Sequence, residues 1–202
     1  MKPQHSTVHR ALELQGGAVS RSQLRRLGLP DSLIDSMRDD GHLVSIFPGV
    51  YRGAGVPPSW LLDLVAATLL LSGRAVASMA TAARLHSLPG YETDPNIEFS
   101  CQLPNRNIGG SVPVHSTRRL DAVDLVRVAL PLADSSRRSR TAEGFGLVTS
   151  VTTTTASRTI IDLARRLNVP ALSRLVDSSV SLKKITIETL VDRLEELRDS
   201  GV

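Results

Sequence analysis

Apolar residues recur at helical spacing through residues 8–41, in three short runs that glycines separate. The positions predicted to be buried are Val8, Ala11 and Leu12, then Leu24 and Leu27, then Leu33, Ile34 and Met37. Gly16-Gly17, Gly28 and Gly41 follow the three runs, and a glycine in the left-handed conformation commonly ends a helix. The pattern therefore predicts three short helices, each with one apolar face.

The second and third helices also carry start signals. Ser20 and Gln23 have the spacing of a capping box, in which each side chain satisfies a backbone group at the helix start. Pro30 and Asp31 suit the first turn of the third helix, because proline fixes φ and an acid complements the helix dipole. Both helices are therefore expected to begin close to these residues.

A hairpin is predicted directly after the third helix. Leu43–Phe47 and Val50–Arg52 have the composition of short strands, and the Pro48-Gly49 turn joins them. Three helices followed by such a two-stranded wing predict a winged helix-turn-helix domain over residues 1–55. The segment Gly53–Pro58 is rich in glycine and proline and is expected to be a linker.

Residues 59–202 predict a second domain of mixed helices and strands. Helices are expected at residues 60–71, 78–85, 159–167 and 171–178 and from residue 186, and strands at residues 73–77, 97–101 and 112–115. The polar Pro104–Gly110 stretch would join the last two strands, and residues 131–146 predict a mobile loop. The fold class is therefore α+β: a winged helix followed by a mixed α/β domain with a small sheet.

Composition narrows the class of protein. The chain has 202 residues, of which 41% are hydrophobic and 22% charged, so it is globular rather than disordered. The longest apolar run, Leu64–Leu71, is far too short to cross a bilayer, and the N-terminus lacks a signal-peptide core. Cys101 is the only cysteine, which excludes disulfide scaffolds and fits a reducing, cytoplasmic location.

The charge balance favours a nucleic-acid partner. The net charge is +4 and the pI is about 9.8. In a winged helix, arginines contact phosphates and polar side chains reach base edges. The side chains expected to contact DNA are Arg21, Gln23, Arg25 and Arg26 in the second helix, Ser32, Ser36 and Arg38 in the third, and His42 and Arg52 in the wing.

The third predicted helix is acidic. Residues 31–40 hold four aspartates against the single arginine Arg38. Carboxylates repel phosphate, so the same helix also suits a protein partner. The loop at 131–146 carries Arg137, Arg138 and Arg140, which are either solvated or add auxiliary phosphate contacts.

The order of these motifs resembles a known family. The matching features are Gly16-Gly17, Ser20, Gly28-Leu29, Gly41 and Gly49-Val50-Tyr51, followed by VASMATAARLHSL, VPVHST and TTASRTIIDLA. Together they resemble AbiEi-type antitoxins of type IV toxin–antitoxin systems. The resemblance implies a DNA-binding transcriptional regulator whose first domain represses its own promoter and whose second domain opposes a nucleotidyltransferase-like toxin.

The chain also departs from this family. Its third helix is acidic where relatives carry several arginines, and Met79 stands where a histidine often follows the serine. Residues 131–146 have the character of an insertion. Many relatives continue into a Vsr-like endonuclease domain. Two other readings therefore stay open: a protein-interaction module without DNA binding, and the non-catalytic N-terminal part of a nuclease-fused relative.

The sequence predicts no catalytic residue, metal site or cofactor. Asp121 and Asp124 follow Gly110-Ser111, but their spacing would place them on opposite faces of a strand, so they would not share a metal. Neither lysine of the Lys183-Lys184 pair has an acid two positions before it, as one class of nucleases requires. Arg158 and Asp162 have the spacing of an intrahelical ion pair.

Overall fold

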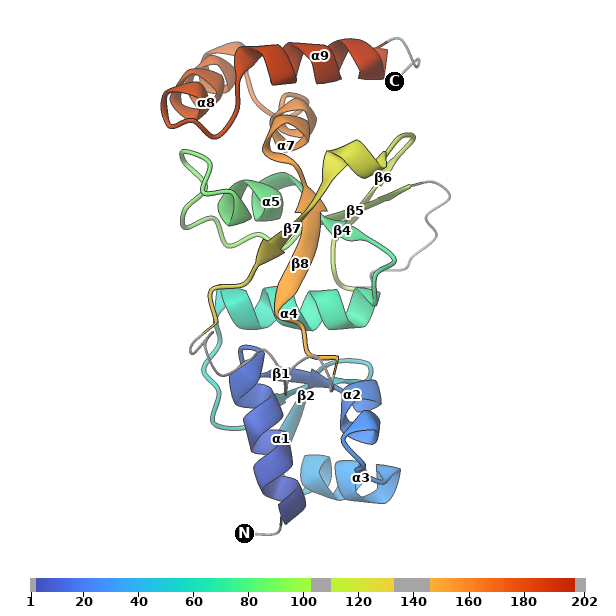
Figure 1. Cartoon of the computed structure of the whole chain (residues 1–202). Helices are drawn as coiled ribbons and strands as arrows, with labels where there is room; N and C mark the ends of the chain where they lie inside the picture. The colour runs from blue at the N-terminus through green and yellow to red at the C-terminus, as the bar shows by residue number, and fades with distance from the viewer. Residues whose placement is uncertain (1–2, 103–109, 133–145, 199–202) are drawn as a thin grey trace. The chain divides into compact units, whose positions relative to one another are not determined.

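The computed structural model describes residues 3–102, 110–132 and 146–198 (Figure 1). The chain divides into two compact units. The first consists of residues 1–73 and 129–151, and the second of residues 74–128 and 152–202. The first unit thus extends beyond the winged helix predicted for residues 1–55, because it includes a further helix and a segment far along the chain.

The winged helix is built from six short elements in chain order. They are α1 (Pro3–Leu14), β1 (Ala18–Ser20), α2 (Arg21–Arg26), α3 (Asp31–Asp39), β2 (Leu43–Phe47) and β3 (Val50–Gly53). The strands form an antiparallel sheet in the order β1-β3-β2, with Val19 opposite Tyr51 and Ser45 opposite Tyr51 on the other side. Strand β1 was not predicted, since three residues are too few to show a period.

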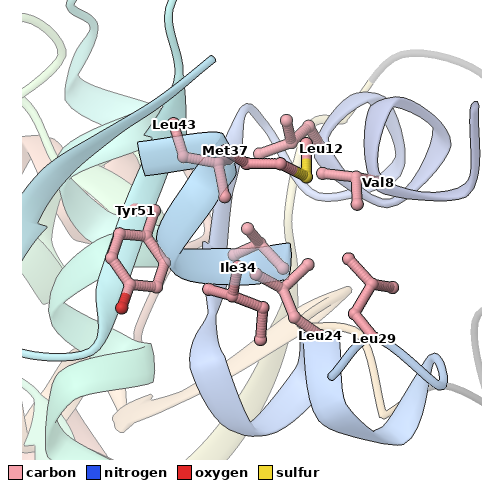
Figure 2. Packing of buried hydrophobic residues seen from close by; sticks show 9 residues of the cluster. Val8, Leu12, Leu24, Leu29, Ile34, Met37, Leu43 and Tyr51 are labelled. Atoms are coloured by element: carbon pink, nitrogen blue, oxygen red, sulfur yellow. The ribbon is translucent and has the colours of Figure 1, made fainter. Parts of the chain in front are cut away.

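The core of the winged helix joins all three helices to the sheet (Figure 2). Its buried members are Val8, Leu12, Val19, Leu24, Leu29, Ile34, Met37, Leu43 and Tyr51. Leu33 was expected to face inward with Ile34, but it is only partly buried. Leu27, which was also expected to face inward, is likewise only partly buried. Apolar spacing identified five members of this core correctly and missed Val19 and Leu29; the five are Val8, Leu12, Leu24, Ile34 and Met37.

Helix α4 (Trp60–Leu71) completes the first unit together with a return of the chain. The Ser59 side chain accepts a hydrogen bond from the Leu62 backbone N–H and so begins the helix. Helix α4 contacts β1 and β3, and a Cβ added at Gly16 would touch both Leu61 and Leu132. Even this most apolar helix has only twelve residues, so no described helix reaches the length needed to span a membrane.

The second unit is built around a five-stranded sheet. Its elements are β4 (Val76–Ala77), α5 (Met79–Leu85), β5 (Phe99–Gln102), β6 (Val114–Thr117), the 3-10 helix η1 (Ala122–Asp124), β7 (Leu125–Ala129), β8 (Ser150–Thr154), α7 (Ala156–Leu163), α8 (Val169–Ser181) and α9 (Ile187–Arg198). The strand order is β6-β5-β4-β8-β7. Strands β5 and β6 pair in parallel, and the turn expected at 104–110 lies outside the described residues except for Gly110.

Two expectations for the helices of the second unit are corrected by the structure. Pro170 lies in the first turn of α8 rather than between two helices, because a proline there loses no helical hydrogen bond. The helical spacing of five aliphatic residues predicts that α9 buries one aliphatic face: Ile187, Leu190, Val191, Leu194 and Leu197. It buries Leu197 together with Arg193, whereas Ile187, Val191 and Leu194 are 51%, 43% and 51% exposed. A charged group in the interior therefore sets the orientation of α9.

That charged group belongs to a buried ion-pair cluster. Asp124 is fully buried and accepts hydrogen bonds from Arg193 Nε and Nη2, each at 2.7 Å. Arg158 Nη1 approaches the same carboxylate at 3.1 Å, and Arg158 Nε donates to Asp162 at 3.0 Å, which confirms the predicted intrahelical pair. The Asp124 carboxylate, at the end of η1, thus binds Arg158 of α7 and Arg193 of α9.

Candidate nucleic-acid interface

Helices α2 and α3 form the helix-turn-helix pair, and their starts follow the sequence signals. The Ser20 hydroxyl accepts from Gln23 N at 3.2 Å, and Gln23 Oε1 accepts from Ser20 N at 2.9 Å, which confirms the capping box. Pro30 precedes α3 in extended conformation, and Asp31 lies in its first turn. Ile34 and Met37 are buried, so the opposite, polar face of α3 points to solvent.

An ion-pair network covers this polar face. Arg25 binds Asp31 with two parallel hydrogen bonds, from Nε at 2.8 Å and from Nη2 at 2.6 Å. Arg21 donates to Asp31 at 3.1 Å and also binds Asp35. Arg38 lies 3.3 Å from Asp35. Each arginine proposed to contact phosphate on this face therefore already has a carboxylate partner.

Arg38 completes the network at the end of α3. It donates from Nη2 to Asp39 at 3.0 Å, so the network joins three arginines to three aspartates. The two signs balance, and we call these six residues the neutral face: Arg21, Arg25, Asp31, Asp35, Arg38 and Asp39. A surface of this kind carries polar groups without a net field to attract a phosphate backbone.

Hydrogen bonds within the neutral face raise the pKa values of Arg21 and Arg25 and lower that of Asp31. The hydrogen bond to Tyr51 Oη and the one to Asp35 raise the pKa of Arg21. The Arg25 guanidinium lowers the pKa of Asp31, and its own pKa rises in return. Asp31 therefore remains ionised well into the acidic range, and its ion pairs with Arg21 and Arg25 persist at physiological pH.

Gln23 does not belong to the interface. It is only 1% exposed, and its side-chain amide is occupied by Ser20, Gln15 and the carbonyl oxygen of Gly146. The capping box turns the side chain back toward the helix start, which removes it from solvent. We therefore withdraw Gln23 from the residues expected to contact DNA.

The remaining candidates lie in several environments. Ser32 is exposed near the start of α3, and the Ser36 hydroxyl donates to Asp40 at 3.0 Å.

Arg26 is exposed with its guanidinium against Gly146, and among the described residues no carboxylate pairs with it. His42 is exposed beside the end of α3. Arg137, Arg138 and Arg140 lie outside the described residues.

Arg52 has a partner that the sequence did not suggest. Its Nη1 donates to the backbone oxygen of Val56 at 3.0 Å and reaches that of Ala54 at 3.5 Å. The side chain is only partly exposed and is directed along the segment that follows β3. Arg52 therefore holds residues 54–56 in place and is a weak candidate for phosphate contact.

The carboxylates considered for catalysis have structural partners in the second unit. Arg193 binds both Asp121 and Asp124, and the Asp121 backbone N–H donates to Asp124. Asp121 directly precedes η1 and Asp124 is its last residue, so neither lies on a strand. Near the sheet, Glu98 accepts from Arg166 at 2.7 Å, lies 3.0 Å from His115 Nε2, and also accepts from the backbone of Ala80. These carboxylates are bound by cations, as expected for groups that hold helices and strands together.

Sequence reasoning missed Gln15 and the pairing partners of the arginines. Gln15 lies in the turn after α1 and is fully buried, although glutamine is usually exposed. The only signal was its position beside Gly16-Gly17. The aspartates were noted as acidic, but the pairing of Asp31 and Asp35 with α2 required the angle between the two helices.

A comparison with known protein families tests the resemblance to AbiEi-type antitoxins. Residues 8–52 match a family model. Its description is transcriptional regulator, AbiEi antitoxin. The match confirms the AbiEi-type resemblance from α1 to β3, the elements of the winged helix. The AbiEi-type features noted at 76–88, 112–117 and 154–164 lie beyond the match and stay predictions. No curated protein is significantly similar to the chain.

Proposed function

We propose that the chain is a DNA-binding transcriptional regulator that acts as an antitoxin of a type IV toxin–antitoxin system. One observation carries this proposal: the segment that matches the AbiEi regulator family is the one folded as a winged helix with an exposed polar face on α3. In such domains the third helix enters the major groove and the wing contacts the backbone.

DNA contact requires the neutral face to exchange partners. Solvent screens an ion pair at the surface and leaves it little net stability, so a phosphate oxygen can replace Asp31 at Arg25 at little cost. The displaced carboxylates stay close to the phosphates and repel them. Arg26, which has no described carboxylate partner, makes its phosphate contact without such an exchange. The proposed interface therefore binds DNA with moderate affinity.

The finer roles follow from the AbiEi-type resemblance. The first domain would repress the promoter of its own operon, and residues 59–202 would counteract a nucleotidyltransferase-like toxin. We infer that the chain works without catalysis of its own. Asp124, the most buried carboxylate in the described part of the chain, binds Arg158 and Arg193. A group held in this way activates neither a metal nor a nucleophile.

A titration with fluorescent duplex DNA from the region upstream of the gene tests the proposal. We expect binding that weakens with salt, because each neutralised phosphate releases counterions. Replacing Arg25 and Arg26 with alanine should weaken binding to all sequences alike and reduce the salt dependence. Arg174→Ala, an exposed arginine in α8, is the matched control and should leave binding unchanged. No binding at low salt and micromolar protein contradicts the proposal.

The neutral face favours one second candidate, a protein-interaction module. Three arginines and three aspartates that satisfy one another suit a polar protein surface as well as they suit DNA. Growth rescue separates the two. If residues 59–202 protect cells from the cognate toxin without the winged helix, the first domain has a separate task. If the Arg25/Arg26 variant binds DNA normally but loses protection, the neutral face docks a protein.

A further inference from the structure

A cavity of about 660 Å³ lies in the first unit beside the winged-helix core. Helix α1 forms one wall, the end of α3 with the start of β2 forms a second, and residues 53–56 form the third. This volume falls within the range of small-molecule sites, which is about 300–1,000 Å³. The cavity is separate from the neutral face, none of whose residues lines it.

The inner wall of the cavity is aliphatic. Leu43, Met37, Leu12 and Val8 lie next to one another in the core, and all four line the cavity (Figure 2). Each is less than 10% exposed. The flexible thioether of Met37 adapts to irregular shapes. A ligand seated here would therefore contact the same side chains that pack α1 against α3.

Gly55 is an exposed residue that lines the cavity. A Cβ added at Gly55 would meet nothing within 4 Å, and its φ lies outside the left-handed range. The contrast is Gly17, where a left-handed φ and Val56 at 2.4 Å both require glycine. Neither backbone geometry nor packing explains the missing side chain at Gly55. A side chain at Gly55 would therefore meet open space beside the cavity that this residue lines.

Hydrogen bonds hold the walls of the cavity in place. The Ala54 N–H donates to the His42 carbonyl at 3.1 Å, and Val56 N donates to Gly53 O at 3.0 Å. Arg52 fixes the same segment through the carbonyl of Val56. His42 N–H in turn donates to Met37 O at 2.8 Å, which ties this wall to the end of α3. The cavity is therefore preformed.

The charges at the cavity edge are already balanced. Glu13 Oε1 lies 3.3 Å from His9 Nδ1, and its Oε2 accepts from Arg10 at 3.4 Å. A charged ligand would have to break these contacts to find a counter-ion on α1. The aliphatic wall and the paired edge together favour a neutral, mostly apolar molecule.

We propose that this cavity binds a small, neutral and mostly apolar molecule, and that the bound molecule acts on α3 through Met37 and His42. The second half of the proposal rests on the proposed DNA binding. The first half stands on the cavity alone. A ligand with different affinity for two positions of α3 would shift the population that binds DNA.

Two fluorescent probes test the site: N-phenyl-1-naphthylamine, which is neutral, and its 8-sulfonate analogue, which carries a negative charge on the same ring system. We expect saturable fluorescence enhancement with the neutral probe and weaker binding of the sulfonate. The Gly55→Phe variant should fill the cavity and weaken binding of the neutral probe by more than about tenfold. Gly55→Ala, whose methyl group meets open space, is the control and should bind the neutral probe nearly as the natural chain does.

Methionine methyl resonances locate the probe independently of any variant. The chain has three methionines, Met1, Met37 and Met79. Of the two that the structure describes, Met37 lines the cavity and Met79 does not. With methyl-labelled methionine, the neutral probe should move the Met37 signal and leave Met79, in the second unit, unchanged. An unmoved Met37 signal, or equal probe binding by Gly55→Phe, overturns the proposal.

The DNA titration repeated with saturating probe completes the test. A change in DNA affinity in the natural chain that is absent in Gly55→Phe supports the action on α3. Probe binding at Met37 with an unchanged DNA affinity overturns that half. If the chain binds the probe at Met37 but binds no DNA under any condition, the proposed function fails and the ligand site remains.

Discussion

The side-chain amides of Gln15 and Gln23 pair with one another in the interior of the first unit. Gln23 Nε2 donates to Gln15 Oε1 at 3.0 Å, and Gln15 Nε2 donates to Gln23 Oε1 at 2.9 Å. The pair also binds the returning chain, because the Val148 N–H donates to Gln15 and Gln23 donates to the Gly146 carbonyl. A single polar pair thus joins α1, α2 and a distant segment.

Gln23→Ala should destabilise the first unit by roughly 1–3 kcal/mol, because it removes the capping box and leaves buried polar groups without partners. Chemical denaturation followed by circular dichroism measures the change. Gln102→Ala is the matched control, since Gln102 is exposed in the second unit. Equal stability of the two variants would mean that water replaces the lost contacts.

Asp35→Asn should tighten DNA binding by roughly threefold to tenfold, because it frees Arg21 and Arg38 from a shared carboxylate and removes a charge that repels phosphate. Fluorescence anisotropy with the upstream duplex gives the affinity. Asp40→Asn removes the same charge, but its carboxylate accepts from Ser36 rather than from an arginine, and it should have a smaller effect. A weaker complex with Asp35→Asn contradicts the exchange of partners.

Asp124→Asn should destabilise the second unit by roughly 3–5 kcal/mol, because it leaves Arg158 and Arg193 buried without their shared counter-charge. Thermal unfolding measures the loss, which should appear as an earlier transition. Asp177→Asn, at an exposed position of α8, should unfold like the natural chain. A normal unfolding transition for Asp124→Asn would show that the cluster contributes little to stability.

The stability of the second unit should fall as the pH drops below neutrality. Burial lowers the pKa of His86 from its ordinary value of 6.5, and its Nε2 lies 2.7 Å from the Thr154 carbonyl. The unfolded chain therefore takes up a proton at a higher pH than the folded chain does. The stabilising effect is complete above 6.5 and is lost as the pH falls toward the lowered pKa.

Melting temperatures compared between about pH 7.5 and about pH 5.5 test this pH dependence. His86→Gln retains a hydrogen-bond donor without the titration, so its melting temperature should fall less over this range. His9→Gln, at a position that is largely exposed, should behave like the natural chain. An identical pH profile for His86→Gln would assign the loss to other groups.

Much of the winged helix could be predicted because its signals are local. The spacing of apolar residues predicts which face of each helix is buried. Ser20 and Gln23, within four residues of each other, predict the capping box. Strand β1 could not be predicted, since its pairing with β3 is a property of the sheet. Strand β7 could not be predicted either, since Leu125–Ala129 lacks the alternation of apolar and polar residues that marks a half-buried strand.

The candidate site was less predictable, because it depends on partners from different elements. Arg21 and Arg25 were expected to contact phosphate, but their positions bring them to Asp31 across the turn between α2 and α3. The burial of Arg193 is similar. The sequence of α9 contains no signal that Arg193 is buried. Its burial depends on an ion pair with Asp124, which lies 69 positions earlier in the chain.

The return of the chain to Gln15 and Gln23 also bears on the order of events during protein synthesis. Gly146 follows Gln23 by 123 positions, so a nascent chain exposes the winged helix long before this partner leaves the ribosome. At about 5–20 residues per second the delay is roughly 6–25 seconds. During that interval the glutamine pair lacks its distant partners, and premature release of the chain would leave the first unit unfinished.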